Sequence, residues 1–440
     1  MVSVYQCFDP LKVCVVGRTY PPEFYSGIKN VKVRSAMERL AIETEEDYQK
    51  LIKKLEEFGV EVLRLDVSDN VDDYKDHNGV VTAQPPMTPR DFSAQVGKTF
   101  YMPSPNYGEN FDVESLYFGM LSDGGEMNSS RTSKNKWHKS KEQQNREGVL
   151  AQYFEDLLQP GRPLSQQAAL DSFKNREDVL NSPLKFLQGI DREELEKLII
   201  AAETNTIGSN DKFPSRKNVY AWTSVKNWLE KNNVPIVYDQ YIAAASMWRL
   251  GKDLFFNYVN LINKLNEESF LKKWRKLFPD FRVHGIDSPG HGDGVMHPVK
   301  EGLILAIRNE EWYKKYYPDW EIVTVKDRKR IKPFLDMKDK NRGRWWIPGE
   351  EDNQDLIDYI HTWLDHWVTY AEETVFDLNV LPIDEKNCIV NGYNKTIFDA
   401  FERHGITPHV VNFRHRWFWD GGLHCITSDI HREGEMKTFW

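Results

Sequence analysis

The segment Val299-Lys-Glu-Gly-Leu-Ile-Leu-Ala306 places a polar turn between short apolar runs, which is the pattern of a β-hairpin. Other segments share its plan of a polar turn followed by an apolar or mixed strand: Asp9–Gly17, Pro89–Gly97, Leu250–Phe256 and Ile383–Val390. A unit of this kind cannot bury its apolar face alone, so its recurrence indicates an architecture built from repeats.

A helical pattern and a further strand follow most of these segments. The predicted helices are 48–58, 254–278, 312–317 and 397–401, and the strands after them are 60–65, 281–286, 320–325 and 406–412. No clear helix and strand pattern follows the second segment, Pro89–Gly97. Units of strand, strand, helix and strand around one axis predict an α/β fold, a five-bladed α/β propeller. An ordinary mixed α/β sheet remains the alternative.

Residues 122–235 interrupt this repeated pattern of strands and helices. Residues 122–148 are polar, and the basic run 131–141 is interpreted as a solvated loop, with a polyanion patch as the alternative. Asp191-Arg-Glu-Glu194 has the form of a helix N-cap, and 223–231 is a further predicted helix. We therefore expect one domain over 1–440, with an inserted polar loop and helical subdomain at 122–235.

Composition restricts the function classes. The chain has 440 residues, 58 basic and 67 acidic side chains, a net charge of −9 and 40% hydrophobic residues. This apolar content is enough for a sizeable core, and the acidic balance argues against general nucleic-acid binding. No apolar run approaches the roughly 20 residues that span a bilayer. Residues 1–10 lack the pattern of a secretory signal, so we expect a soluble cytoplasmic protein.

The chain has four cysteines, and none of them forms a CxxC pair, which argues against a disulfide scaffold or a cysteine-based zinc site. Cys14 and Cys388 fall in predicted strands and are expected in the core. Cys425 lies in Asp420-Gly-Gly-Leu-His-Cys425-Ile-Thr-Ser-Asp429, where paired glycines permit close approach of the backbone. Either a reactive thiolate or a small core residue fits that position.

A second constellation is Gly290-His-Gly-Asp293-Gly-Val-Met-His297. In an extended stretch, His291 and Asp293 point to the same side, which suits proton transfer and cation binding. A metal site formed by His291, Asp293 and His297 is the alternative. We expect no metal, because the sequence offers no second ligand cluster. Pro89-Arg-Asp91 is by itself an ordinary turn. It becomes a candidate part of the site only if the propeller brings it to the same cavity as His291 and Asp293.

Together these motifs resemble the amidinotransferase family, within the guanidine-modifying superfamily that also holds arginine deiminases. The segment Gly421-Gly-Leu-His-Cys425-Ile-Thr-Ser-Asp-Ile430-His-Arg432 is similar to the family signature, and His291-Gly-Asp293 to its His-x-Asp. Two further segments with such similarity are Met87-Thr-Pro-Arg-Asp91 and Arg249-Leu-Gly-Lys-Asp253-Leu-Phe. The family fold is a five-bladed α/β propeller, in agreement with the repeats.

The resemblance implies an enzyme that moves the amidino group of arginine to an amine acceptor and releases ornithine. Cys425 would be the nucleophile, His291 the acid and base, and Asp91 and Asp293 the carboxylates that hold the guanidinium. The resemblance implies small-molecule substrates, no cofactor, and no nucleic-acid or membrane partner, and it leaves a homodimer open. A hydrolase that forms citrulline, or an arginine-binding homologue with impaired catalysis, are the alternatives.

The sequence departs from the family at two places. Ala243 stands where the family carries the acid that orients the histidine, and by analogy with catalytic triads its loss would lower the rate by about 10⁴. Asp239 could replace that acid if the strand shifts register. Glu372 and Glu373 stand where the family places small serines near the substrate, which would suit a cationic acceptor.

Overall fold

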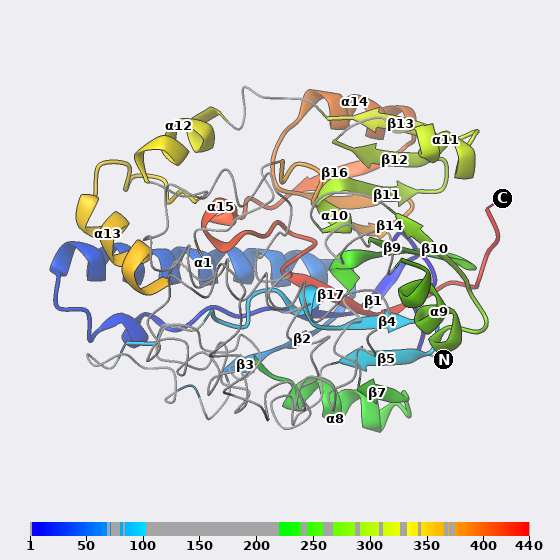
Figure 1. Ribbon diagram of the computed structural model, residues 1–440, viewed down its shortest axis with the longest axis horizontal. Helices are drawn as coiled ribbons and strands as arrows, with labels where there is room; N and C mark the ends of the chain where they lie inside the picture. The colour runs from blue at the N-terminus through cyan, green and yellow to red at the C-terminus, as the bar shows by residue number, and fades with distance from the viewer. Residues whose placement is uncertain are drawn as a thin grey trace, which may run out of the picture. The chain divides into compact units, whose positions relative to one another are not determined.

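Figure 1 shows the computed structural model of the chain, which describes a defined set of its residues. They are 2–67, 71, 80–81, 84–102, 220–238, 244–257, 267–286, 291–307, 311–325, 332–341, 345–364, 368 and 375–439. All of them lie in one compact unit, made of Met1–Ser104 and Arg216–Trp440.

Within the described residues, five three-stranded sheets share one pairing plan, in which the central strand is antiparallel to one neighbour and parallel to the other. The first sheet is β17 (Thr427–Arg432), β1 (Leu11–Val16) and β2 (Glu61–Arg64), and the second is β4 (Ala94–Val96), β5 (Thr99–Met102) and β7 (Ile236–Tyr238). The third is β8 (Met247–Leu250), β9 (Asp253–Asn257) and β10 (Arg282–Ile286), and the fourth is β11 (Met296–Lys300), β12 (Leu303–Ala306) and β13 (Glu321–Thr324). The fifth is β14 (Leu381–Asp384), β15 (Asn387–Val390) and β16 (Thr407–Val410).

A helix connects the two parallel strands of every sheet, because parallel neighbours need a crossover connection. These helices are α1 (Val31–Glu57), α8 (Thr223–Lys231), α9 (Glu267–Leu277), α11 (Glu311–Tyr316) and α14 (Lys395–Arg403). The predicted unit of strand, strand, helix and strand is therefore confirmed for the other four three-stranded sheets of the described chain, whereas the first sheet takes its antiparallel strand from the distant β17. The second unit, which showed no sequel in the sequence, has one in α8 and β7.

Three local predictions were wrong. The helix expected over 254–278 is wrong at its start, where Leu254 lies in β9, because a short apolar run is ambiguous between helix and strand; α9 lies within the later described part of that range. The segment 9–17 is no hairpin, since β1 pairs with the distant β17. Pro89–Asp91 forms a short 3₁₀ helix, η3, and the second hairpin turns later, at Gly97.

The insertion expected at 122–235 lies outside the described residues up to residue 219. From residue 220 onward the described chain comprises a short strand β6 (Tyr220–Ala221), which pairs with β3 (Asp66–Val67), and then α8. These elements lead into β7 of the second sheet, so the helix predicted at 223–231 is confirmed as the crossover of that sheet.

The sheets contact one another in chain order. β17 of the first sheet contacts β4 of the second, and η3 of the second contacts η6 (Ala244–Ser246), which precedes β8. β8 contacts α10 (Gly292–Val295), which leads into β11, and β11 contacts β14. β14 in turn contacts β1, so the series of contacts returns to the sheet in which it started.

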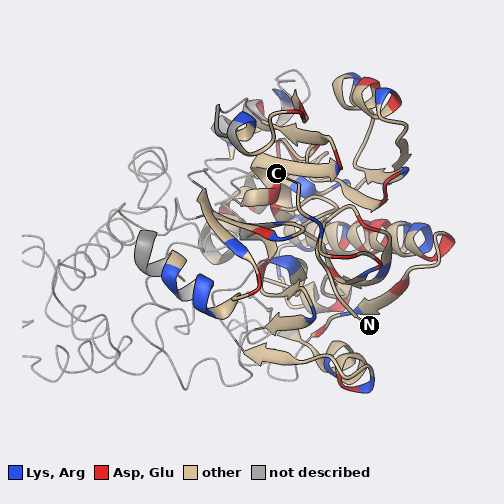
Figure 2. Cartoon of the chain, turned by 90° about the vertical axis from the view of Figure 1, so that its right-hand side faces the viewer, with Lys and Arg blue, Asp and Glu red and all other residues tan. Residues whose placement is uncertain are grey.

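Charged residues of both signs are intermingled along the helices in the view of Figure 2. On exposed helix faces they form pairs four residues apart, such as Lys395 with Asp399 on α14 and Lys332 with Asp336 on α12 (Lys332–Lys340). No helix among the described residues is long and apolar enough to cross a membrane.

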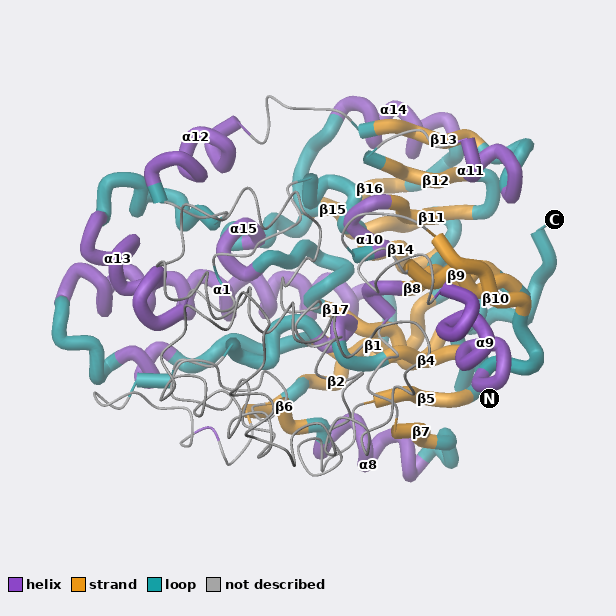
Figure 3. The backbone as a smooth tube through the Cα atoms, in the orientation of Figure 1, coloured by secondary structure: helices purple, strands orange, loops and turns teal. Residues whose placement is uncertain are grey.

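The long helix α1, which Figure 3 shows as a purple tube, contributes many buried side chains to one large hydrophobic core cluster. Asn30 caps its start, since its side chain accepts hydrogen bonds from the backbone N–H groups of Lys32 and Val33. Its buried side chains join those of β1, of α13 (Gln354–Tyr359) and of α15 (Arg416–Trp419) in that cluster. The same core therefore supports both the first sheet and the segment that leads from α15 to β17.

Candidate active site

Cys425 lies in the short segment between α15 and β17. Asp420 ends α15 in the left-handed conformation, with φ of 50°, and the paired glycines follow it. The backbone N–H of Ile426 donates to the carbonyl of Gly422, and this turn holds the thiol in the interior, where Cys425 is 1% exposed.

Asn379 holds both the thiol and its backbone. The side-chain Nδ2 of Asn379 lies 3.0 Å from Cys425 Sγ. Its Oδ1 accepts hydrogen bonds from the backbone N–H groups of His424, at 2.8 Å, and Cys425, at 3.0 Å. Sequence reasoning assigned no role to Asn379, because the residues it contacts lie about 45 positions further along the chain.

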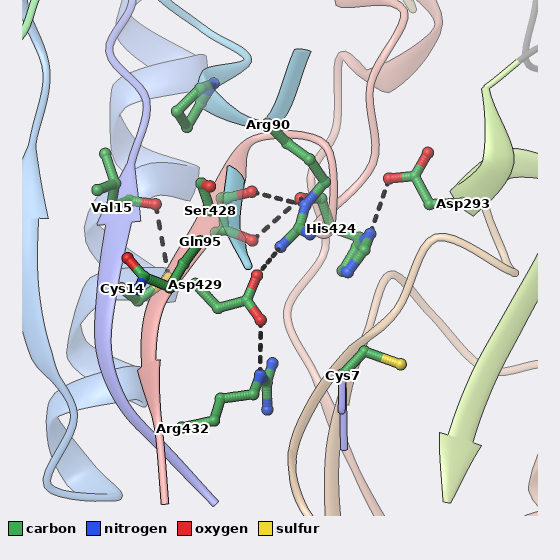
Figure 4. Close-up of polar contacts among 12 residues, drawn as sticks. Cys7, Cys14, Val15, Arg90, Gln95, Asp293, His424, Ser428, Asp429 and Arg432 are labelled. Atoms are coloured by element: carbon green, nitrogen blue, oxygen red, sulfur yellow. Dashed lines mark hydrogen bonds and ion pairs between the residues drawn. The ribbon is translucent and has the colours of Figure 1, made fainter. Parts of the chain in front are cut away.

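Asp293 faces the same thiol from α10. Its Oδ2 accepts from Cys425 Sγ at 3.5 Å and lies 2.7 Å from His424 Nδ1, a contact drawn in Figure 4. Its Oδ1 is buried and has no hydrogen-bond partner among the described residues. Burial raises the pKa of Asp293 to about 6, against the opposing effects of His291 and Arg90. The carboxylate is thus placed beside the thiol with one acceptor atom available for a cation.

His291 and Asp91 lie next to each other beside this group. His291 is the N-cap of α10, and its Nδ1 is 3.7 Å from Asp91 Oδ1. The expectation of an extended stretch at 291–293 was wrong, because Gly292–Val295 form a helical turn. Even so, the charges of both His291 and Asp91 act on the pKa of Asp293, so the three groups share one site.

Two further histidines are buried beside Asp293. The ring centroids of His297 and His424 are 4.4 Å apart. Burial lowers the pKa of His297 to about 3 and that of His424 well below its ordinary value, and the charge of Arg90 adds to both effects. Both rings are therefore neutral near pH 7. The described residues contain no group of three or more His, Cys, Asp or Glu side chains that could hold a metal.

A buried arginine cluster lies directly behind the motif; it consists of Asp429 with Arg90, Arg249 and Arg432. Arg90 Nη2 and Arg249 Nη2 lie 3.0 and 2.7 Å from Asp429 Oδ1. Arg432 Nε lies 2.8 Å from Asp429 Oδ2, and Figure 4 shows its contact and that of Arg90. Arg90 Nε also donates to the carbonyls of His424 and Thr427, so the cluster fixes the backbone on both sides of Cys425.

The arginines of this cluster belong to three different sheets. Arg90 precedes β4, Arg249 lies in β8, and Arg432 ends β17. The motifs that contain them were visible in the sequence, but their convergence on Asp429 was not, because only the tertiary fold brings them together.

The other three cysteines have a different environment. Cys14 in β1 and Cys388 in β15 are buried, as expected for core residues, and Cys7 donates to the carbonyl of Pro298 at 3.1 Å. Burial raises the pKa of Cys7 to about 11 and of Cys14 to about 12, and it raises that of Cys388 further. These thiols are not poised to act as nucleophiles.

The structure places Cys425, Asp293, Asp91 and His291 in one site. The catalytic and binding roles expected for them from the sequence remain predictions. Asp239, Ala243, Glu372 and Glu373 lie outside the described residues.

Known proteins provide an independent comparison. The chain is 29% identical over 209 residues to the mitochondrial glycine amidinotransferase of Xenopus tropicalis, a match that covers 45% of this chain and 40% of that protein. It is 22% identical over 241 residues to an L-arginine:L-lysine amidinotransferase of Pseudomonas savastanoi pv. phaseolicola, covering 53% and 56% of the two. The matches thus span less than two thirds of these relatives. No family model matches the chain.

Among solved structures, an inosamine-phosphate amidinotransferase of Streptomyces griseus aligns with 100% of this chain and 99% of its own, at a TM-score of 0.48 and 17% identity. Over about half of its length the chain is thus similar in sequence to curated amidinotransferases, in agreement with the resemblance noted from the motifs.

Proposed function

We propose that this protein is an amidinotransferase that moves the amidino group of arginine to an amine acceptor and releases ornithine. The observation that carries the proposal is the position of Cys425 Sγ, buried 3.5 Å from Asp293 Oδ2 and 3.0 Å from Asn379 Nδ2. A thiol between a carboxylate and an amide donor can meet the carbon of a guanidinium that the same carboxylate holds.

The first half-reaction forms a covalent intermediate. Cys425 Sγ attacks the central guanidinium carbon as the thiol proton passes to the imidazole of His291. This proton then goes to the ornithine nitrogen as its bond to that carbon breaks. Ornithine leaves, and the amidino group remains bonded to sulfur.

The second half-reaction reverses these roles. The acceptor amine gives a proton to His291 and forms a bond to the amidino carbon, and the bond from carbon to Cys425 Sγ breaks. The thiolate takes the proton back from His291, which restores the enzyme.

Two carboxylates support the cationic substrate in this proposal. Asp293 Oδ1, which has no partner among the described residues, and Asp91 would each accept hydrogen bonds from the guanidinium. Asp91 also lies 3.7 Å from His291 Nδ1, so it is placed to orient the imidazole. Position 243 carries alanine in place of the acid that orients the histidine in the family. Asp91 is therefore one candidate for that orienting role, and Asp239 is the other.

The five sheets support a matching proposal for the fold. We propose that they are the blades of a closed five-bladed α/β propeller, since each contacts the next and the fifth contacts the first. Cys425, Asp91 and Asp293 then come from different blades and meet near its axis. An insertion within 122–235 and a cytoplasmic location remain predictions from the sequence.

The acceptor is proposed to be a cationic amine, because Glu372 and Glu373 add negative charge at the expected acceptor position. A relative is named an L-arginine:L-lysine amidinotransferase, so lysine belongs in the acceptor panel beside glycine and a diamine.

The test is to incubate the enzyme with arginine labelled in the guanidino carbon and each amine, and to identify products by mass spectrometry. We expect ornithine and an amidinated amine in equal amounts, and an amidino group on Cys425 when no amine is present. Labelled citrulline would instead identify a hydrolase. Binding of arginine by calorimetry, with neither product nor adduct, would identify an impaired homologue.

Matched variants assign the adduct to one cysteine. Cys425→Ser should abolish product and adduct. Cys7→Ser is the control, because a serine hydroxyl can donate to the Pro298 carbonyl as the Cys7 thiol does. An adduct that persists in Cys425→Ser would overturn the assignment of the nucleophile.

A further inference from the structure

We propose that Asn379 is a further residue of the catalytic machinery, which donates a hydrogen bond to the sulfur of Cys425 and thereby stabilises its thiolate. The inference deepens the proposed function, on which its role in turnover rests. It begins from the contacts of one buried side chain, since Asn379 is 0% exposed.

The orientation of the Asn379 amide follows from its partners. The backbone N–H groups of His424 and Cys425 are donors, so the atom that faces them, at 2.8 and 3.0 Å, must be the acceptor Oδ1. The other end of the amide must then be the NH₂ group. That group lies 3.0 Å from Cys425 Sγ, and because it has only donors, the sulfur is the acceptor.

The backbone of the motif is shaped around this amide. A Cβ atom on Gly422 would lie 2.7 Å from both Cβ and Oδ1 of Asn379, closer than side chains approach one another. The second glycine of the motif is thus required for the close approach of Asn379. On the opposite side, Asn391 Nδ2 donates to the carbonyls of Phe376 and Asn379, which fixes the turn that carries the amide.

The sulfur of the neutral thiol has both of its hydrogen-bonding roles filled. It accepts from Asn379 and donates to Asp293 Oδ2 at 3.5 Å. When the proton leaves, the bond from Asn379 becomes charge-assisted and stronger, whereas the contact with the Asp293 carboxylate becomes repulsive. Asn379 therefore favours the reactive form of the nucleophile before any substrate arrives.

Among the described residues, other charged and titratable groups of this site come from η3, α10, β8, β11, β17 and the motif itself; they include Arg90, Asp91, Arg249, His291, Asp293, His297, His424 and Asp429. All of them are retained when Asn379 alone is changed. A change in the ionisation of Cys425 in an uncharged variant such as Asn379→Ser therefore reports on the amide, whereas Asn379→Asp adds the repulsion of a new carboxylate to that effect.

Asn379→Asp is the informative substitution, because it keeps the shape and the acceptor for the two backbone N–H groups. It replaces the donor at Cys425 Sγ by a carboxylate oxygen. Loss of a charge-assisted hydrogen bond corresponds to about one to two pKa units, so we expect the pKa of Cys425 to rise by at least about one unit.

The pKa is measured from the rate of alkylation of Cys425 by iodoacetamide as a function of pH, with the modified residue located by mass spectrometry. At pH 7 the rate should fall about tenfold or more in Asn379→Asp. At high pH the rates of variant and wild type should converge, because both thiols are then ionised. A purely structural role would change the rate equally at every pH.

Asn30→Asp is the matched control, since Asn30 is exposed, caps α1 and uses the same side-chain oxygen to accept two backbone N–H groups. Its alkylation profile should equal that of the wild type. If Asn379→Asp does not fold by circular dichroism, Asn379→Ser removes the amide donor without adding charge and should raise the pKa by a smaller amount.

An unchanged alkylation pKa in both folded variants would overturn the role of Asn379. Alkylation needs no arginine, so this outcome is separate from the proposed function. A raised pKa in a protein that never releases ornithine would retain Asn379 and refute amidino transfer. Release of ornithine without any shift in the pKa of Cys425 would support amidino transfer and refute the role of Asn379.

Discussion

Replacing Asp429 by Asn is expected to destabilise this protein more than any other single substitution in the buried arginine cluster. Among the described residues, Asp429 is the only anion in direct contact with Arg90, Arg249 and Arg432 together, and all four side chains are buried. Burial by itself raises the pKa of Asp429, yet the three arginines outweigh it and hold the pKa well below its ordinary value.

The magnitude follows from these contacts. In Asp429→Asn the amide oxygen can still accept from two guanidinium groups, but the new NH₂ group faces the Nε donor of Arg432. Removal of one partner from a buried ion pair lowers the free energy of unfolding by about 3–5 kcal/mol, and we expect at least that much. Arg249→Met removes a cation from a cluster with excess positive charge, so it should lower the free energy by less, about 1–3 kcal/mol.

The assay is urea denaturation followed by tryptophan fluorescence and circular dichroism. Asp399→Asn is the control, because its pair with Lys395 is exposed and exposed pairs contribute little to stability. A loss below about 1 kcal/mol in Asp429→Asn, or an equal loss in Arg249→Met, would refute the charge argument.

The pH dependence has a defined sign. A carboxyl group whose pKa is depressed in the folded chain contributes stability above its unfolded pKa of about 3.9, and loses it as the pH falls through the folded pKa. The difference in stability between wild type and Asp429→Asn should therefore be constant from about pH 8 to about pH 5 and narrow below about pH 4.

Three further predictions concern the site and its support. Gly422→Ala should slow ornithine release by about 100-fold, because the new Cβ would displace Asn379; wild-type kinetics would contradict the close approach. The kcat/KM for arginine should be half-maximal near pH 6 and fall at lower pH, because protonation of Asp293 removes the charge that pairs with guanidinium; a profile that is flat down to about pH 5 would exclude that group. Thr44→Val should lower the free energy of unfolding by about 1–3 kcal/mol, measured by urea denaturation, because it leaves the buried Trp419 N–H, which donates to Thr44 Oγ1 at 2.8 Å, unpaired; a loss below about 0.5 kcal/mol would argue against this bond.

The fold could be predicted from local patterns wherever those patterns were unambiguous. The helix at Thr223–Lys231 and the strands near 282–286 and 321–324 follow from spacing alone. Leu254 was assigned to a helix because three apolar residues in a row fit either structure, and only pairing with β8 and β10 decides for a strand. No local pattern could indicate that β1 pairs with β17.

The candidate site was predictable to the extent that residue chemistry is visible in short motifs. Cys425, His291 and Asp293 stand in such motifs, and the structure places them together. Asn379 lies in an apolar segment and acquires its role only through contact with a turn far along the chain. The signal in the sequence was the glycine pair Gly421-Gly422, since paired glycines permit another group to approach the backbone closely, but the pair does not identify that group.

The pairing of β1 with β17 has a consequence for the order of biosynthesis. More than 400 residues separate the partners, so the first sheet stays incomplete on the ribosome until almost all of the described chain has been made. Cys425 directly precedes β17 and is held by that same closure. We expect nascent chains that end before β17 to be sensitive to protease in β1 and α1. The contacts that hold Cys425 would then form only in chains that already contain β17.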